Sequence, residues 1–171
     1  MTSFAYFGPT EKHSVPKGGF CISVFAVAKE DDRVLLLKPR DHPRWEEEWA
    51  PNWRRYSQER LLHEYESWRF PSSYVKEGES PEETLSRIMR EQLEVRSYEI
   101  TSSRLLNYYE PSRGFPGSMH WDYCFVYGVK LNERASLKPW CTAVEYVATA
   151  GLKPEDFGSA QGSLAIELKL I

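Results

Sequence analysis

Residues 68–95, WRFPSSYVKEGESPEETLSRIMREQLEV, place a turn, a helix start and a group of carboxylates in one short stretch. Ser80 can cap free backbone N–H groups, and Pro81 suits the first position of a helix. The two glutamates that follow favour the positive end of the helix dipole. The pattern predicts a helix from about Pro81 to Val95, and the rest of the chain can be understood as the support for this unit.

The predicted helix is amphipathic, because successive side chains turn by about 100° around a helix axis. One side carries Leu85, Ile88, Met89, Gln92, Leu93 and Val95, and the other carries Glu83, Arg87, Arg90, Glu91 and Glu94. We therefore expect the first side to pack on a core and the second, including Arg87 and Glu91, to face water.

Residues 73–95 resemble the Nudix box, G-x5-E-x7-R-E-U-x-E-E-x-G-U, in which U is a bulky aliphatic residue. The agreement is at Glu79, Arg87, Met89, Glu91 and Val95, and the family's usual Gly-Glu-Ser turn stands at Gly78, Glu79 and Ser80. The departures are Ser73 and Glu94 at the two glycines and Ile88 and Gln92 at two of the glutamates. The chain is thus similar to the Nudix hydrolase superfamily through a degenerate box.

The resemblance implies metal-dependent chemistry. In the family, three glutamates on one helical face bind Mg²⁺ or Mn²⁺ against a substrate diphosphate, and the metal activates water. The implied catalytic residues are Glu91, Arg87 and Glu79, and the implied metal ligands are Glu91, Gln92 and Glu94. Arg87 would orient a carboxylate by paired hydrogen bonds. Two of the three anionic ligands are missing, so we expect weakened metal binding.

Two other interpretations of the same residues stay open. A register three residues later aligns Arg90, Glu91 and Glu94 with the box, but it loses the Gly-Glu-Ser turn and puts Lys76 at the first glycine. Without the motif, Glu79 and Arg87 would be an ordinary surface ion pair, worth about 0–1 kcal/mol.

Composition points to a globular protein of one domain. The chain has 171 residues, a mass of 20.0 kDa and a net charge of −3, which gives no overall nucleic-acid footprint. Its three cysteines, Cys21, Cys124 and Cys141, show no C-x-x-C spacing and are odd in number, so we expect free thiols in a reducing compartment. No stretch suits a signal peptide or a membrane span, which favours a cytoplasmic protein without a membrane partner.

Runs rich in apolar, β-branched and aromatic residues predict strands on both sides of the box. They cover residues 20–29, 33–37, 98–109, 120–131 and 141–148, and a last helix is expected at 162–171, where a spacing of two also permits a strand. The resemblance and this order imply an α/β fold, a Nudix-type α/β/α sandwich with a mixed sheet. We treat residues 1–171 as a single Nudix-like domain, with residues 1–17 as an N-terminal lead.

Residues 41–67 are expected to form an extra helical insertion, with a helix that starts near Pro51. The tryptophans of the insertion could pack on the sheet, form a substrate lid or form a homodimer interface. In a lid, an aromatic ring would stack on a nucleobase, worth about 1–3 kcal/mol per base, while arginine would bind phosphate. The candidate substrate-binding residues are Arg44, Trp53, Arg54, Arg55 and, on a later strand, Tyr123.

In relatives, a further acid beyond the box often completes the metal site or serves as a base. Glu110, Asp122 and Glu145 are the candidates for this role, and the sequence does not separate them.

Two functional hypotheses follow from the resemblance. The first is a divalent-metal-dependent pyrophosphohydrolase that acts on a nucleoside diphosphate linked to another moiety. The second is a catalytically inactive Nudix-fold module that binds a nucleotide or RNA, and Ile88 and Gln92 favour it because they replace metal-binding acids with neutral side chains. The ligand expected in both cases is a nucleotide-like small molecule, with RNA as the further possibility in the second.

Overall fold

The computed structural model describes residues 19–111, 117–159 and 161–171, so the expected N-terminal lead lies outside the described residues. The strands are β1 (Phe20–Glu30), β2 (Arg33–Pro39), β3 (Ser72–Tyr74), β4 (Tyr98–Pro111), β5 (Met119–Leu131) and β6 (Cys141–Ala148). The helices are α1 (Gln58–Glu66), α2 (Pro81–Gln92) and α3 (Gln161–Glu167), with short helical turns η2 (Trp45–Trp49), η3 (Pro51–Arg55) and η4 (Pro154–Asp156).

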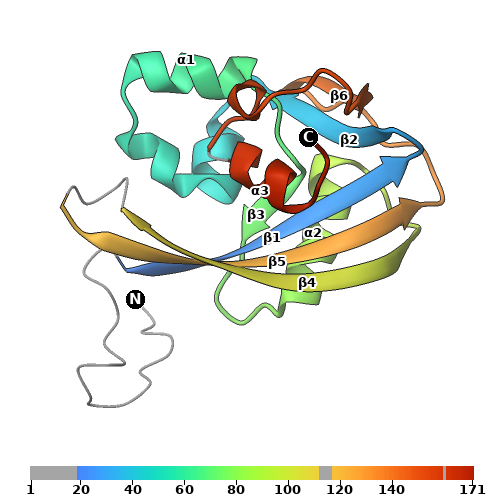
Figure 1. Cartoon of the computed structure of the whole chain (residues 1–171), viewed down its shortest axis with the longest axis horizontal. Coiled ribbons are helices and arrows are strands. Elements are labelled where there is room, and N and C mark those ends of the chain that lie inside the picture. The colour runs from blue at the N-terminus through green and yellow to red at the C-terminus, as the bar shows by residue number, and fades with distance from the viewer. Residues whose placement is uncertain (1–18, 112–116, 160) are drawn as a thin grey trace.

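The strands form one mixed sheet in the order β4-β5-β1-β2-β6, and the short β3 pairs with β1 beside this path. β1 and β5 run parallel, whereas all the other pairs are antiparallel. β1 and β2 form the predicted hairpin, in which Lys29 pairs with Val34. Figure 1 shows β1, β5 and β4 as long twisted strands that lie side by side.

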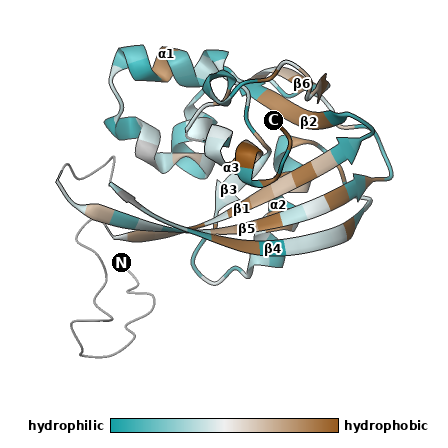
Figure 2. Ribbon diagram, viewed as in Figure 1, coloured by the Kyte–Doolittle hydropathy of each residue, from teal (hydrophilic) through white to brown (hydrophobic). Residues whose placement is uncertain are grey.

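Helices cover both faces of the sheet, which confirms the predicted α/β/α sandwich. On one face, Leu85, Ile88 and Met89 of α2 pack against alternate residues of β1 and β5. On the other face, Leu164 and Ala165 of α3 pack against the intervening residues of the same strands. Figure 2 shows hydrophobic residues concentrated in the central strands, whereas α1 is largely hydrophilic.

Helix α2 begins as the sequence predicts and ends earlier. The Ser80 hydroxyl accepts from Glu83 N–H at 3.1 Å, and the Glu83 carboxylate accepts from Ser80 N–H at 2.7 Å, which completes a capping box. The helix ends at Gln92 rather than near Val95, because Glu94 adopts a left-handed φ of 60° and Val95 N–H bonds to Met89 O at 2.9 Å.

The insertion is a chain of short turns followed by α1. The expected helix start at Pro51 is wrong: Pro51 opens only the 3₁₀ turn η3, and α1 starts at Gln58 after a Ser57 cap. The rings of Trp45, Trp49 and Trp53 pack together on Leu37 and Cys141. This packing agrees with the interpretation in which the tryptophans cover the sheet.

The C-terminal segment is a helix and not a strand, over Gln161–Glu167. Figure 1 places it beside the insertion, on the same side of the long strands. None of the helices in the described part of the chain has the length and apolar content that crossing a bilayer requires.

Candidate functional site

Arg87 ties the turn before α2 to strand β3. Its Nε and Nη2 donate to the two oxygens of Glu79 at 2.7 and 2.8 Å, Nη1 donates to Ser73 Oγ at 3.0 Å, and Nη2 also reaches Tyr74 O at 2.9 Å. The side chain is only 6% exposed. The expected solvated position of Arg87 is therefore wrong, because these acceptors satisfy its charge inside the protein.

Glu79 is held as an anion. Its hydrogen bonds from Arg87, supported by one from Thr84 Oγ1 at 2.9 Å and one from Lys76 N–H at 3.2 Å, lower its pKa to about 2. A carboxylate with this pKa is a poor proton acceptor at neutral pH. Glu79 thus fixes the turn in which Gly78 takes a φ of 82°.

The two neutral residues of the box point away from solvent. Ile88 is fully buried in the core that α2 shares with β1 and β5. Gln92 is also fully buried, and its amide bonds to strand β3 at both atoms: Oε1 accepts from Ser72 N–H at 3.1 Å, and Nε2 donates to Ser72 O at 2.7 Å. Both side chains thus stabilise the fold and are not available as metal ligands.

The two remaining acids of the box differ in their surroundings. Glu91 accepts from Arg90 Nη2 at 3.1 Å through Oε1, and its Oε2 is buried without a hydrogen-bond partner among the described residues. Glu94 is exposed and pairs with Lys138. Ile88 offers no ligand atom, and Gln92 has used both of its polar atoms on Ser72. Glu91 is therefore the one carboxylate left at the three metal-binding positions of the box, although hard cations such as Mg²⁺ prefer several oxygen ligands.

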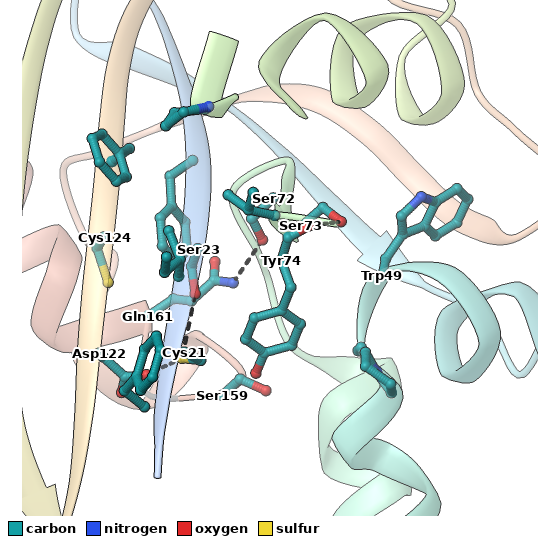
Figure 3. A pocket seen from close by; sticks show the side chains of 18 of the residues that line it. Cys21, Ser23, Trp49, Ser72, Ser73, Tyr74, Asp122, Cys124, Ser159 and Gln161 are labelled. Atoms are coloured by element: carbon teal, nitrogen blue, oxygen red, sulfur yellow. Dashed lines mark hydrogen bonds between the residues drawn. The ribbon is translucent and has the colours of Figure 1, made fainter. Parts of the chain in front are cut away.

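A cavity of about 1200 Å³ opens beside the box. Its walls come from the first part of β1, from β3, from the turn at residues 78–81, from η3 and from α3. Figure 3 shows Cys21 and Ser23 of β1, Asp122 and Cys124 of β5, and Trp49 of the insertion around it. Ile88, Glu91, Gln92 and Glu94 are not among the residues that line it.

Of the five candidate substrate-binding residues, Arg55 is the one whose side chain belongs to the described lining of the cavity. Trp53 is fully buried and stacks on Trp45 at a centroid distance of 5.5 Å, so it offers no face to a ligand. Arg54 is exposed but lies outside the lining.

The other two candidates contact other side chains and are not among the residues that line the cavity. Arg44 pairs with Glu48 at 3.2 Å and lies over the Trp140 ring at 4.5 Å. Tyr123 packs edge to face on Phe20 and on Trp121.

Two further cations reach the cavity from different elements. Lys76 lies in the exposed turn after β3. Arg69 is buried, and its Nη1 donates to Glu64 Oε2 at 2.7 Å and to Ser159 Oγ at 3.1 Å. Glu64 also accepts from Ser159 N–H at 3.2 Å and from Ser159 Oγ at 2.7 Å. This buried ion pair joins α1 to the segment that precedes α3.

The three candidates for a further acid lie in different places in the structure. Asp122 lines the cavity, whereas Glu145 is exposed on β6 and the side chain of Glu110 lies outside the described residues. Two neighbours of Asp122 were not predicted. The Cys21 thiol donates to Asp122 Oδ1, and His120 Nε2 lies 3.2 Å from the same oxygen.

Burial, and after it the nearby Asp122 carboxylate, raise the pKa of the Cys21 thiol well above its usual range. The sequence alone could place two of these three residues together, because His120 and Asp122 are two residues apart on a predicted strand and so share a face. Only the parallel pairing of β1 with β5 brings Cys21 to them.

Neither a family model nor a curated protein sequence matches the chain. Solved structures do resemble it. A MutT protein from Methanosarcina mazei has a TM-score of 0.58 at 14% identity, over 88% of this chain and 93% of that one. An ADP-ribose pyrophosphatase from Streptococcus suis has a TM-score of 0.51 at 12% identity, over 87% and 91%.

A UDP-X diphosphatase has a TM-score of 0.55 at 16% identity, over 88% of this chain, which spans 60% of that protein's chain. A MutT Nudix hydrolase from Burkholderia pseudomallei is similar at a TM-score of 0.55 and 16% identity, over 86% of this chain and 96% of that one. The chain therefore has the Nudix fold.

Proposed function

We propose that this protein binds a nucleoside diphosphate derivative in the cavity beside the box, without a metal cage on helix α2. The observation that carries the proposal is the contrast between the cavity beside the box and the face of helix α2. The cavity is open and about 1200 Å³ in volume, whereas the helix face that would hold the metal is closed by Ile88 and by the hydrogen bonds of Gln92 to Ser72.

The lining of the cavity supports a ligand with a phosphate part and an aromatic part. Arg55 and Lys76 bring positive charge to the walls, and a guanidinium can bind two phosphate oxygens at once. Phe20, Tyr56 and Tyr74 bring rings on which a base can stack. Two of the structural neighbours act, by their names, on ADP-ribose and on UDP derivatives, so these are the first ligands to test.

Calorimetric titration of the purified protein with ADP-ribose and with UDP-glucose, in EDTA and then in Mg²⁺, tests the proposal. We expect binding of at least one of the two in EDTA, with little change when Mg²⁺ is added. Arg55→Ala should weaken that binding by about 10- to 150-fold, since a hydrogen bond to a charged group contributes about 1.5–3 kcal/mol. Arg54→Ala is the matched control, because Arg54 is the neighbour outside the lining.

Two results would contradict the proposal. The first is that neither ligand binds at millimolar concentration. The second is that the two arginine variants lose the same affinity, which would mean that the cavity does not contact the ligand. A short single-stranded RNA that displaces the bound nucleotide would instead identify the ligand as the end of a longer chain.

Hydrolysis of such a derivative is the second candidate function. It is favoured by Oε2 of Glu91, which is buried and has no hydrogen-bond partner in the part of the chain that the structure describes. A lone buried carboxylate oxygen costs free energy unless a ligand, an ion or a proton satisfies it. The test is product analysis by chromatography after incubation with ADP-ribose and Mg²⁺ or Mn²⁺. Turnover that Glu91→Gln abolishes, with the melting temperature unchanged, would establish this function and replace the first proposal.

A further inference from the structure

We propose that Cys21, His120 and Asp122 form a binding site for Zn²⁺ or a similar transition-metal ion in the wall of the cavity. The pairing of the strands places these residues together. β1 and β5 run parallel with Cys21 opposite Asp122, and His120 lies two residues before Asp122 on the same face of β5. All three residues line the cavity.

The geometry of the three side chains fits one ion. Their ligand atoms all lie within 4.8 Å of one another. His120 Nε2 is 3.2 Å from Asp122 Oδ1, and the Cys21 thiol bonds to that same oxygen. Tetrahedral zinc, with bonds of about 2.0–2.3 Å, places neighbouring ligand atoms roughly 3.4–3.6 Å apart, so small side-chain shifts suffice.

The mixture of ligands selects the class of metal. One sulfur, one imidazole nitrogen and one carboxylate oxygen suit Zn²⁺ and Co²⁺, whereas Mg²⁺ prefers oxygen ligands alone. When the metal binds, the thiol of Cys21 releases its proton to solvent, and the sulfur coordinates the metal as a thiolate. Mg²⁺ at millimolar concentration should therefore not displace the bound ion.

The arrangement also differs from that of an activated cysteine nucleophile. In such a pair the imidazole contacts the thiol directly and takes its proton. Here both the thiol and the imidazole contact one oxygen of Asp122, so the three ligand atoms gather around that oxygen, within 4.8 Å of one another. Convergence of three unlike donors is what a metal site needs.

Three protein ligands leave a fourth position of a tetrahedral ion for water or for an anion of a ligand. Because the three residues lie in the wall, this position would face the cavity. The site itself is inferred from β1 and β5 alone and does not depend on the nucleotide ligand. Its test uses metal alone, so either proposal can fail without the other.

Titration of the EDTA-stripped and dialysed protein with Co²⁺ tests the site directly. We expect one ion per chain and a near-ultraviolet absorption from thiolate to cobalt charge transfer, which Zn²⁺ abolishes by displacement and Mg²⁺ does not. Cys21→Ala should remove this absorption. Asp122→Asn should lower the Co²⁺ affinity by at least about 100-fold, since losing an outer partner alone costs about 10–100-fold.

Cys124→Ala is the matched control. Cys124 is on the same face of β5, beside Ser23 in the register, but is not part of the group of three, so this variant should keep the absorption. Circular dichroism establishes that each variant is folded. The site is overturned if folded parent protein shows no thiolate absorption with Co²⁺, or if folded Cys21→Ala and Asp122→Asn both bind Co²⁺ as tightly as the parent.

Discussion

Gln92 holds both backbone polar atoms of Ser72. The carboxamide donates to the carbonyl at 2.7 Å and accepts from the N–H at 3.1 Å, so the end of helix α2 acts as a further strand partner for β3. A glutamate, which the Nudix box has at this position, could accept from the N–H but could not donate to the carbonyl when ionised. The glutamine is thus matched to the backbone that it contacts.

Gln92→Glu should destabilise the protein by about 1–3 kcal/mol at pH 7, because Ser72 O loses its donor and a carboxylate becomes buried. Burial raises the pKa of the new carboxyl in the folded state, so the loss should be smaller at pH 4 than at pH 7. Urea denaturation at the two pH values measures this. Gln58→Glu, at an exposed position of α1, is the control and should change stability little.

Restoring the box more fully should not restore a metal site. Ile88 has no exposed surface, so Ile88→Glu would bury a charge at a cost of about 3–5 kcal/mol. We expect Ile88→Glu combined with Gln92→Glu to be largely unfolded and to show no Mg²⁺-dependent release of phosphate. A folded double variant that hydrolyses ADP-ribose with Mg²⁺ would contradict this prediction.

The Glu79–Arg87 pair should make stability depend on pH in the acidic range. The pKa of Glu79 is lowered from 4.5 to about 2, so its stabilisation is complete above about pH 5 and is lost as the pH falls toward 2. Glu79→Gln should cost about 1.5–3 kcal/mol at pH 7, the usual contribution of hydrogen bonds between charged groups, and much less near pH 2.

Chemical denaturation between pH 2 and pH 7 compares this variant with Glu77→Gln, whose carboxylate is in the same turn but is exposed. A difference between parent and Glu79→Gln that stays constant over the whole range would show that the pair does not titrate as stated.

Trp53 should contribute to stability and not to ligand contact. Its ring is fully buried among Trp45, Tyr65 and the Arg69 guanidinium, so Trp53→Ala should cost about 3–5 kcal/mol. Leu62→Ala, at an exposed position of α1, should change stability by less than about 0.5 kcal/mol. Thermal melting measures both, and a wild-type melting temperature for Trp53→Ala would contradict the packing.

Hydrophobic periodicity and local capping residues were sufficient to predict the main helices and strands. The capping residues Ser80 and Glu83 and the apolar side of α2 predicted the box helix and its buried face. Position 94 shows how far such signals extend: the box has a glycine there, and Glu94 takes the left-handed conformation that favours glycine. At position 94 the chain thus keeps the left-handed backbone conformation of the box, although it has a glutamate in place of the glycine.

Features that depend on distant contacts could not be predicted in the same way. Arg87 looked solvated because arginine usually is, and its burial follows from acceptors on β3, a strand too short to leave a pattern. The insertion was predicted as one helix because its turns share the same apolar edge. Cys21 and Asp122 are 101 residues apart in the chain, and only strand pairing brings them together.

The buried Glu64–Arg69 pair and its bonds to Ser159 have a consequence for how the cavity opens. The insertion and the start of α3 cannot separate without breaking the hydrogen bonds that Glu64 and Arg69 make with Ser159, each worth about 1.5–3 kcal/mol because one partner is charged. The two walls should therefore exchange their amide hydrogens as one cooperative unit rather than as a hinged flap and a fixed base. We therefore expect the cavity to be preformed. Ligand association would then be limited by diffusion to the cavity entrance and not by a conformational change of the insertion.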